Sequence, residues 1–191
     1  MKGYHYIKRG IDIILSGMAI VILSPLLLFL CIAIKLDTPG PILFKQKRVG
    51  IHRSFFQIYK FRTMRIDTPK DVPTHMLENP EQYITKVGKF LRKTSLDELP
   101  QIFNIFKGEM SIVGPRPALW NQDDLVAERE KYGANDVTPG LTGWAQINGR
   151  DELEIPDKAR LDGEYVKHLG PWMDLKCFPV SYTHLTLPTK A

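Results

Sequence analysis

Two adjacent carboxylates, Asp97 and Glu98, are the side chains best suited to chemistry in this chain, and Arg92 lies a few residues before them. A carboxylate can attack phosphorus to form an acyl phosphate. Two anions that meet in this way need a cation between them, which implies Mg²⁺ with Asp97 as its ligand. The pair therefore indicates phosphate chemistry, although acids at the start of an ordinary helix are the commoner origin of such a motif.

A helix is expected directly after this pair. Its apolar positions recur at helical spacing and Gly108 is a typical stop; they are Leu99, Ile102, Phe103 and Phe106. Ser95 and Glu98 match a capping box, but Pro100 would then interrupt the helix. We prefer Asp97 at or beside the N-cap, where Pro100 needs no donor. Either register places Asp97 at the positive helix end, where we expect it to be ionised at neutral pH.

Cations accompany the acidic pair on both sides. Residues 45–65 are rich in Lys and Arg and hold no acid. Such a patch rests on anionic lipid headgroups or binds substrate phosphates. Lys60 and Arg62 alternate with aromatic residues and would share one strand face. Arg116 stands between Pro115 and Pro117; this rigid guanidinium suits a phosphate or nucleotide edge, unless the loop is only a structural turn.

Residues 138–150 gather turn and amide residues around Trp144, which could also be a simple core residue. Gln146, Asn148 and Arg150 alternate, so a strand would point all three to one face.

The remaining elements position these groups. Short strands are predicted at 42–44 and 55–59, joined by a turn at 49–52. The proline-containing segment 67–80 is interpreted as a loop or lid, and a basic amphipathic element from Tyr83 leads to Arg92.

A membrane segment precedes all of them. Residues 13–34 carry no charge, and a straight helix of that length spans roughly 33 Å, about the hydrocarbon thickness. Ser24 and Pro25 lie within it, and proline kinks a helix. Both flanks are basic, so both ends favour the cytoplasm. The residues alone fit a re-entrant helix and a kinked transmembrane helix equally well.

Composition narrows the class of protein. The net charge of +5 fits nucleic acid, anionic lipid or a phosphorylated substrate. Nucleic-acid binding explains neither the apolar segment nor the acidic pair, so we expect no nucleic-acid partner. Cys31 and Cys177 give no disulfide framework, which favours a reducing setting for most of the chain.

The motifs together resemble those of the monotopic phosphoglycosyl transferases, the bacterial sugar transferase family that starts surface-glycan assembly. The resemblance runs from about residue 8 to 178, and the motifs occur in the family's order. They are Ser24-Pro25, the segment 59–64, the segment 95–101, the segment 111–117, the segment 139–150 and Asp174-Leu175-Lys176.

This resemblance implies an α+β monotopic membrane protein. It implies a re-entrant helix over 1–36, broken at Ser24-Pro25, and a small, mainly helical catalytic domain over 37–179 on the cytoplasmic face of the bacterial inner membrane. The expected partners are a UDP-sugar, undecaprenyl phosphate and the bilayer, with a homodimer as a further expectation. Neither the sugar nor the glycan pathway follows from the sequence.

The resemblance also implies residue roles. Asp97 would attack the β-phosphate of the UDP-sugar, expel UMP and form a phosphosugar-enzyme intermediate, which undecaprenyl phosphate then attacks. Glu98 would assist as base or metal partner. The substrate-binding candidates are Lys60, Arg62, Arg92, Arg116, Gln146 and Arg150. The alternative is a membrane-anchored protein that binds nucleotide-sugars or anionic lipids without turnover.

The C-terminal end looks foreign to this family. Residues 180–189 resemble the translation of a transposon-based sequencing adapter. We expect residues 180–191 to be non-native and to cut short a C-terminal amphipathic helix that opens near Asp174.

Overall fold

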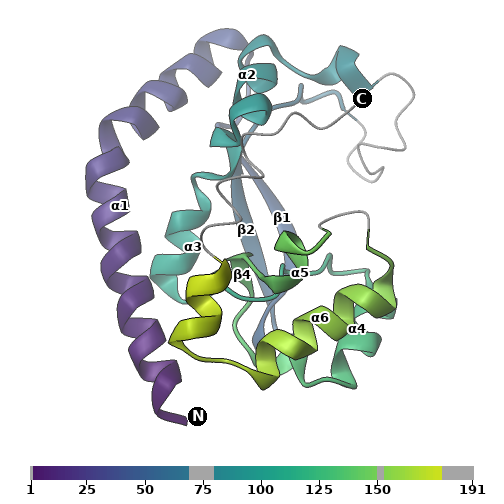
Figure 1. Ribbon diagram of the computed structural model, residues 1–191. Helices are drawn as coiled ribbons and strands as arrows, with labels where there is room; N and C mark the ends of the chain where they lie inside the picture. The colour runs from purple at the N-terminus through teal and green to yellow at the C-terminus, as the bar shows by residue number, and fades with distance from the viewer. Residues whose placement is uncertain (1, 69–79, 150–152, 178–191) are drawn as a thin grey trace.

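The computed structural model describes residues 2–68, 80–149 and 153–177 (Figure 1). Its mixture of helices and strands agrees with the predicted α+β class. Arg150, the segment 180–191 and most of the expected loop lie outside the described residues, so the predictions made for them stay predictions.

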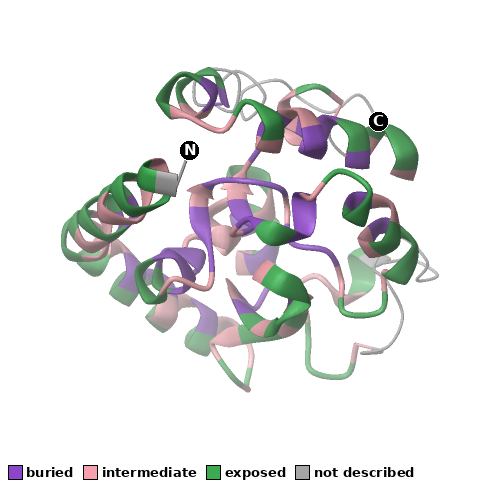
Figure 2. Ribbon diagram, turned by 90° about the horizontal axis from the view of Figure 1, so that it is seen from below, coloured by how far each residue is buried: buried purple, intermediate pink, exposed green. Residues whose placement is uncertain are grey.

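Helix α1 (Lys2–Asp37) contains the predicted membrane segment and is long and apolar enough to cross a membrane. It bends along its length at one side of the molecule (Figure 1). Its buried residues form a stripe at helical spacing that faces the rest of the protein: Asp12, Ser16, Leu27, Leu30 and Ile34. Many of its other apolar residues are exposed. Most of this outlying helix is coloured as exposed or intermediate in Figure 2. The apolar surface of α1 is therefore much wider than the stripe that packs against the rest of the protein.

Ser24 and Pro25 do not interrupt α1, which is continuous through both residues. Proline has no N–H, so the Val21 carbonyl loses its usual helical donor. The Ser24 hydroxyl donates to that carbonyl at 2.8 Å. At the position of the predicted break, the helix therefore continues, and the Ser24 hydroxyl replaces the hydrogen bond that Pro25 cannot make.

Strands β1 (Leu43–Val49) and β2 (Phe55–Phe61) form the predicted antiparallel hairpin. Both strands are longer than expected, and the connection is the short 3-10 helix η1 (Ile51–Arg53). His52 has a φ of 52° there. This left-handed conformation lets the chain reverse within a few residues.

Two short helices pack beside α1. Helix α2 (Lys86–Thr94) is capped at its N-terminus by Thr85, whose side chain accepts from the Gly88 N–H. Helix α3 (Gln101–Lys107) is capped at its C-terminus by Gly108, which has a φ of 91°. The predicted stop at Gly108 is confirmed. One apolar core joins these helices to α1 and the hairpin through Leu27, Leu30, Ile34, Phe61, Leu91 and Ile102.

The second half of the chain forms a separate layer of short elements. Strands β3 (Ser111–Val113) and β4 (Gly140–Thr142) pair in parallel. Helices α5 (Trp144–Ile147) and α6 (Ile155–Lys167) pack against β3 through Val113. Helix α4 (Asp123–Glu130) packs on α6 and on the 3-10 turn η5 (Ala134–Asp136), whereas the 3-10 turn η3 (Pro80–Tyr83) lies before α2 in the first half of the chain. The most buried residues of both layers gather at the centre of the molecule (Figure 2).

The alternation of Gln146, Asn148 and Arg150 suggested a strand, but Gln146 lies in the helix Trp144–Ile147. Gly143 packs so closely on Gly114 that a Cβ there would meet the Gly114 carbonyl oxygen at 2.1 Å. Strand β4 ends just before Gly143, where the two backbones approach each other. The Ile147 N–H then bonds back to the Gly143 carbonyl, as in a helix.

Residues 171–177 form the expected C-terminal helix opening. Asp174 ties this helix to the start of α1, where it accepts from the Tyr4 hydroxyl at 2.7 Å and from Lys8 at 2.5 Å. It also accepts from the Tyr165 hydroxyl at 2.7 Å. The two ends of the described chain are thereby held together by one carboxylate.

Candidate active site

Asp97 and Glu98 lie in the 3-10 turn η4 (Leu96–Glu98), between α2 and α3. The preferred N-cap at Asp97 is wrong, because α3 begins at Gln101 with Pro100 as its cap. The capping box is also absent: Ser95 makes no side-chain cap bond and has a φ of 56°. Its N–H instead reaches the last carbonyls of α2, so Ser95 ends one helix and does not begin the next.

The acidic pair still stands at the start of a helical segment. The Leu99 N–H bonds to the Leu96 carbonyl and the Ile102 N–H bonds to the Leu99 carbonyl, which joins the turn to α3. Backbone N–H groups at such an end carry partial positive charge. This end favours the carboxylates and any anion that approaches them.

Glu98 is held between two cations from distant parts of the chain. Lys60 on β2 donates to it at 2.6 Å, and Arg116 lies 3.5 Å away. Burial raises the pKa of Glu98, but Lys60 and Arg116 together lower it to about 2. Glu98 is therefore ionised at neutral pH, and the fold brings Lys60 and Arg116 against it. The predicted roles of Lys60 and Arg116 in substrate binding stay predictions.

Asp97 behaves differently from its neighbour. Burial raises the pKa of its carboxyl, the Glu98 charge adds to this effect, and Lys60 and Arg92 oppose it. A half-buried carboxylate that is poorly solvated is a better nucleophile than a well-hydrated one, because less water must be removed before attack.

The two arginines predicted beside Lys60 and Asp97 have different surroundings. Arg92 donates through Nε to the Thr63 hydroxyl at 2.9 Å, and its charge acts on Asp97. Arg62 is buried, and its guanidinium donates to three backbone carbonyls, those of Thr38, Pro39 and Pro41. Arg62 thus fastens the end of α1 to the hairpin, a structural contact that the sequence did not indicate.

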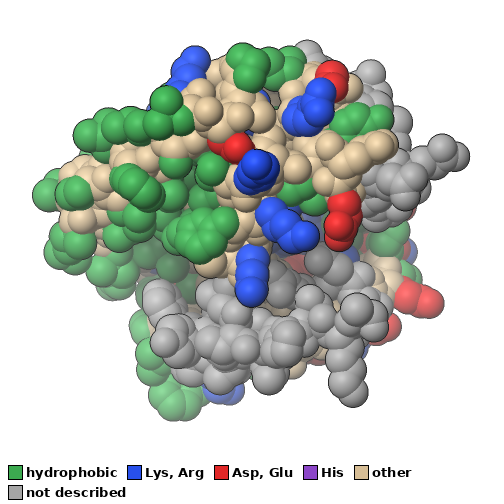
Figure 3. All heavy atoms as spheres, turned by 90° about the horizontal axis from the view of Figure 1, so that it is seen from above, with side chains coloured by type: hydrophobic (Ala, Val, Ile, Leu, Met, Phe, Trp, Pro, Cys, Tyr) green, Lys and Arg blue, Asp and Glu red, His purple; other side chains and the backbone are tan. Residues whose placement is uncertain are grey.

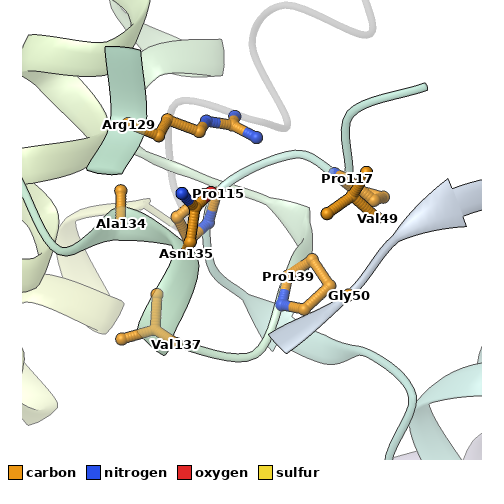
Figure 4. Close-up of a pocket in the computed structure, with 9 residues that line it drawn as sticks. All are labelled: Val49, Gly50, Pro115, Pro117, Arg129, Ala134, Asn135, Val137 and Pro139. Carbon is orange, nitrogen blue, oxygen red and sulfur yellow. The ribbon is translucent and has the colours of Figure 1, made fainter. Parts of the chain in front are cut away.

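The Arg116 loop is fixed from behind by two other arginines. Arg129 donates to the Arg116 carbonyl at 3.0 Å, and Arg48 donates to the Pro117 carbonyl at 3.0 Å. Arg129 is itself paired with buried Asp162 at 2.6 Å. Behind the loop, a cavity of about 10 Å³ lies among proline, valine and Asn135 side chains (Figure 4). It has room for no more than a water molecule.

A second, larger cavity of about 250 Å³ is also lined by residues of this loop. Gln146, a predicted substrate-binding residue, lines it together with Arg116. Arg48, which belongs to the basic segment 45–65, also lines it. Arg129 and Asp162 line it as well, and sequence reasoning missed both. In the sequence these residues are recognisable only as charged residues, and most charged residues of a protein lie on its surface without a specific role.

Basic and apolar side chains occupy one face together. The view in Figure 3 shows several Lys and Arg side chains grouped next to a broad hydrophobic surface. Phe103 and Phe106 on α3 are also substantially exposed, and Phe106 lies against Gly17 of α1. An apolar surface bordered by cations suits an anionic lipid interface.

The described residues contain no group of three or more His, Cys, Asp or Glu side chains that could hold a metal ion. Mg²⁺ does not require such a group, since one or two carboxylates and substrate phosphates often suffice. Asp97 and Glu98 are compatible with that mode of binding.

The family model described as "Bacterial sugar transferase" matches residues 3–186. The match ends inside the segment expected to be non-native, and the origin of that segment stays a prediction. A UDP-glucose:undecaprenyl-phosphate glucose-1-phosphate transferase of Escherichia coli (strain K12) is 41% identical over 183 residues, covering 89% of this chain and 38% of that protein.

Two further relatives carry related names. A protein of Aeromonas hydrophila named UDP-N-acetylgalactosamine-undecaprenyl-phosphate N-acetylgalactosaminephosphotransferase is 39% identical over 178 residues, covering 90% of this chain and 42% of that protein. A UDP-glucose:undecaprenyl-phosphate glucose-1-phosphate transferase of Caulobacter vibrioides (strain ATCC 19089 / CIP 103742 / CB 15) is 41% identical over 178 residues, covering 88% of this chain and 66% of that protein. The chain therefore spans less than two thirds of the length of each of these relatives. Because the family model covers nearly the whole chain, the protein belongs to the bacterial sugar transferase family.

Proposed function

We propose that this protein transfers a sugar-1-phosphate from a UDP-sugar to undecaprenyl phosphate. The observation that carries the proposal is the placement of Asp97 and Glu98 at a helical N-terminal end, with Lys60, Arg92 and Arg116 around them. The names of the relatives supply the reaction class. Those names differ in the sugar, so the donor sugar of this chain is left open.

In the proposed reaction, an Asp97 carboxylate oxygen attacks the β-phosphorus of the donor. The phosphorus–oxygen bond to UMP breaks, UMP leaves with the bond electrons, and an aspartyl phosphosugar remains. A phosphate oxygen of undecaprenyl phosphate then attacks the same phosphorus and releases the Asp97 carboxylate. Lys60 and Arg116 hold Glu98 ionised, and Arg92 supplies positive charge beside the nucleophile.

Mg²⁺ fits this site as a bound partner of the substrate phosphates. Asp97, with Glu98 next to it, would hold the ion, and the ion would neutralise phosphate charge that otherwise repels the nucleophile. We leave Arg62 out of the proposed substrate site because its N–H groups are occupied by backbone carbonyls.

We also propose that α1 enters and leaves the bilayer on the cytoplasmic side. The bend of α1, Pro25 within it and the Ser24 contact to the Val21 carbonyl support this topology. So does Asp174, which holds the start of α1 against the C-terminal helix through Lys8. A helix whose first turns contact the catalytic part cannot place those turns across the membrane.

Labelling of single cysteines tests the topology. In a background with Cys31 and Cys177 replaced by serine, Gly3→Cys and Lys89→Cys should both resist an impermeant maleimide in intact spheroplasts. Both should react after lysis. Labelling of Gly3→Cys in intact spheroplasts would show that α1 spans the membrane.

Release of UMP tests the reaction itself. The full chain in nanodiscs, supplied with Mg²⁺ and a panel of UDP-sugars, should release UMP continuously only when undecaprenyl phosphate is present. The productive donor identifies the sugar. Folded protein that binds a UDP-sugar and releases no UMP under any of these conditions would favour a binding protein without turnover.

A further inference from the structure

The short segment that follows β2 is fixed by backbone hydrogen bonds to the residues that lead into α2. The Thr85 N–H donates to the Thr63 carbonyl at 3.0 Å, and the Arg65 N–H donates to the Tyr83 carbonyl at 2.8 Å. Thr63 itself is buried. Because both bonds join main-chain atoms, the Thr63 backbone has a defined position relative to the start of α2.

The first turn of α2 packs directly on this backbone. A Cβ on Gly88 would meet the Thr63 carbonyl oxygen at 2.1 Å, so only glycine permits the approach. The same turn is capped twice: Thr85 Oγ1 accepts from the Gly88 N–H at 2.9 Å, and Asp37, at the end of α1, accepts from the Val87 N–H at 3.0 Å. These short contacts determine where α2 lies relative to Thr63.

Arg92 follows Gly88 by four residues on α2 and therefore lies on the same face of the helix. Its Nε donates to the Thr63 hydroxyl at 2.9 Å. The guanidinium group is planar, so a hydrogen bond at Nε restricts the rotation of that plane. The edge formed by the two terminal nitrogens is left for another partner.

This terminal edge of Arg92 is unoccupied by protein. Among the described residues, its two terminal nitrogens have no hydrogen-bond partner, and neither is sealed from solvent. Arg62, by contrast, uses both of its terminal nitrogens on the Pro39 and Thr38 carbonyls. The charge of Arg92 acts on Asp97, so the guanidinium lies near the acidic pair. A guanidinium edge of this kind can bind two phosphate oxygens at once.

We propose that Thr63 is a positioning residue, which holds the Arg92 guanidinium so that its two terminal nitrogens bind the β-phosphate of the donor. This inference rests on the proposed function, because it names the residue that orients Arg92 beside the phosphate that Asp97 attacks. Thr63 acts through Arg92 and contacts no substrate. A guanidinium held in place before the donor binds loses less side-chain freedom on binding, which increases the affinity for the phosphate.

Loss of the Thr63 hydroxyl should weaken the binding of one phosphate selectively. Valine has nearly the shape of threonine but cannot accept the Arg92 Nε–H bond. In equilibrium dialysis with Mg²⁺ and the full chain in nanodiscs, Thr63→Val should bind UDP about tenfold more weakly, whereas binding of UMP, which lacks the β-phosphate, should change less than about twofold. Thr63→Ser keeps the oxygen and should retain the UDP affinity of the unaltered protein.

A purely structural role of the hydroxyl predicts a different result. It would change the affinities for UDP and UMP by the same factor, because nothing in it distinguishes the two phosphates. An equal loss for both nucleotides in Thr63→Val, or no loss for either, would overturn the proposal. The ratio of the two affinities does not depend on the fraction of folded protein.

A double-mutant cycle tests whether Thr63 acts through Arg92. In an Arg92→Gln background, Thr63→Val should cause no further loss of UDP affinity, and a further loss of about tenfold would show that Thr63 acts independently. The control is Thr94→Val, the same substitution at an exposed position of α2, where the hydroxyl bonds only to carbonyls of its own helix. It should leave both affinities unchanged.

The two proposals fail in different ways. Lipid-dependent UMP release by the unaltered protein, without a UDP-selective effect of Thr63→Val, would contradict only this inference. A UDP-selective effect without UMP release would contradict only the proposed reaction.

Discussion

Asp97→Asn is expected to abolish turnover. The amide nitrogen and oxygen of asparagine cannot form the acyl phosphate, and loss of a covalent nucleophile lowers kcat by roughly 10⁴–10⁶-fold. Without undecaprenyl phosphate, the unaltered protein should release a burst of one UMP per active site, whereas Asp97→Asn should release none. Quench-flow measurement of UMP in nanodiscs separates the burst from steady turnover.

The matched control is Asp136→Asn, the same substitution at an exposed carboxylate that pairs with His52. This variant should retain both burst and turnover. Binding of UMP to Asp97→Asn should also persist, because the substitution leaves Lys60, Arg92 and Arg116 in place. A stoichiometric burst from Asp97→Asn would show that another group carries the phosphosugar.

Asp162→Ala is expected to lower the stability of the protein by about 3–5 kcal/mol, because it leaves the Arg129 guanidinium buried without its carboxylate. The thermal midpoint in detergent should fall by about 10 °C. The Arg116 loop should loosen as well, since Arg129 donates to the Arg116 carbonyl. UMP affinity should therefore decrease even at temperatures where the variant is folded.

Asp157→Ala is the control on the same helix, because Asp157 pairs with Arg160 at an exposed position. Its effect should stay within about 0.5 kcal/mol. Replacement of both buried partners, Arg129→Met with Asp162→Leu, should recover most of the lost stability, since no charge is then left unpaired. If the thermal midpoint of Asp162→Ala stayed within roughly 2 °C of that of the unaltered protein, the Arg129–Asp162 ion pair would not be what stabilises this region.

Elements with local signals were predictable from the sequence. The apolar run over 13–34 predicts a long helix, the two short strands joined by a turn around Gly50 predict a hairpin, and Gly108 ends α3 as expected. Each of these features depends on neighbouring residues alone. The same local reasoning failed at Ser95 and at residues 144–147. There, the end of the preceding helix and the approach of Gly114 to Gly143 decide the backbone path.

The sequence by itself determined the acidic pair, its position behind an apolar segment and the candidate cations. Only the tertiary structure decided which cations reach the pair. Lys60 and Arg116 contact Glu98 because packing brings the hairpin and the Arg116 loop together at η4. Arg62 is directed to backbone carbonyls instead. The physical reason is that charge acts over a few ångströms, so its role depends on the contacts that packing creates and not on its place in the chain.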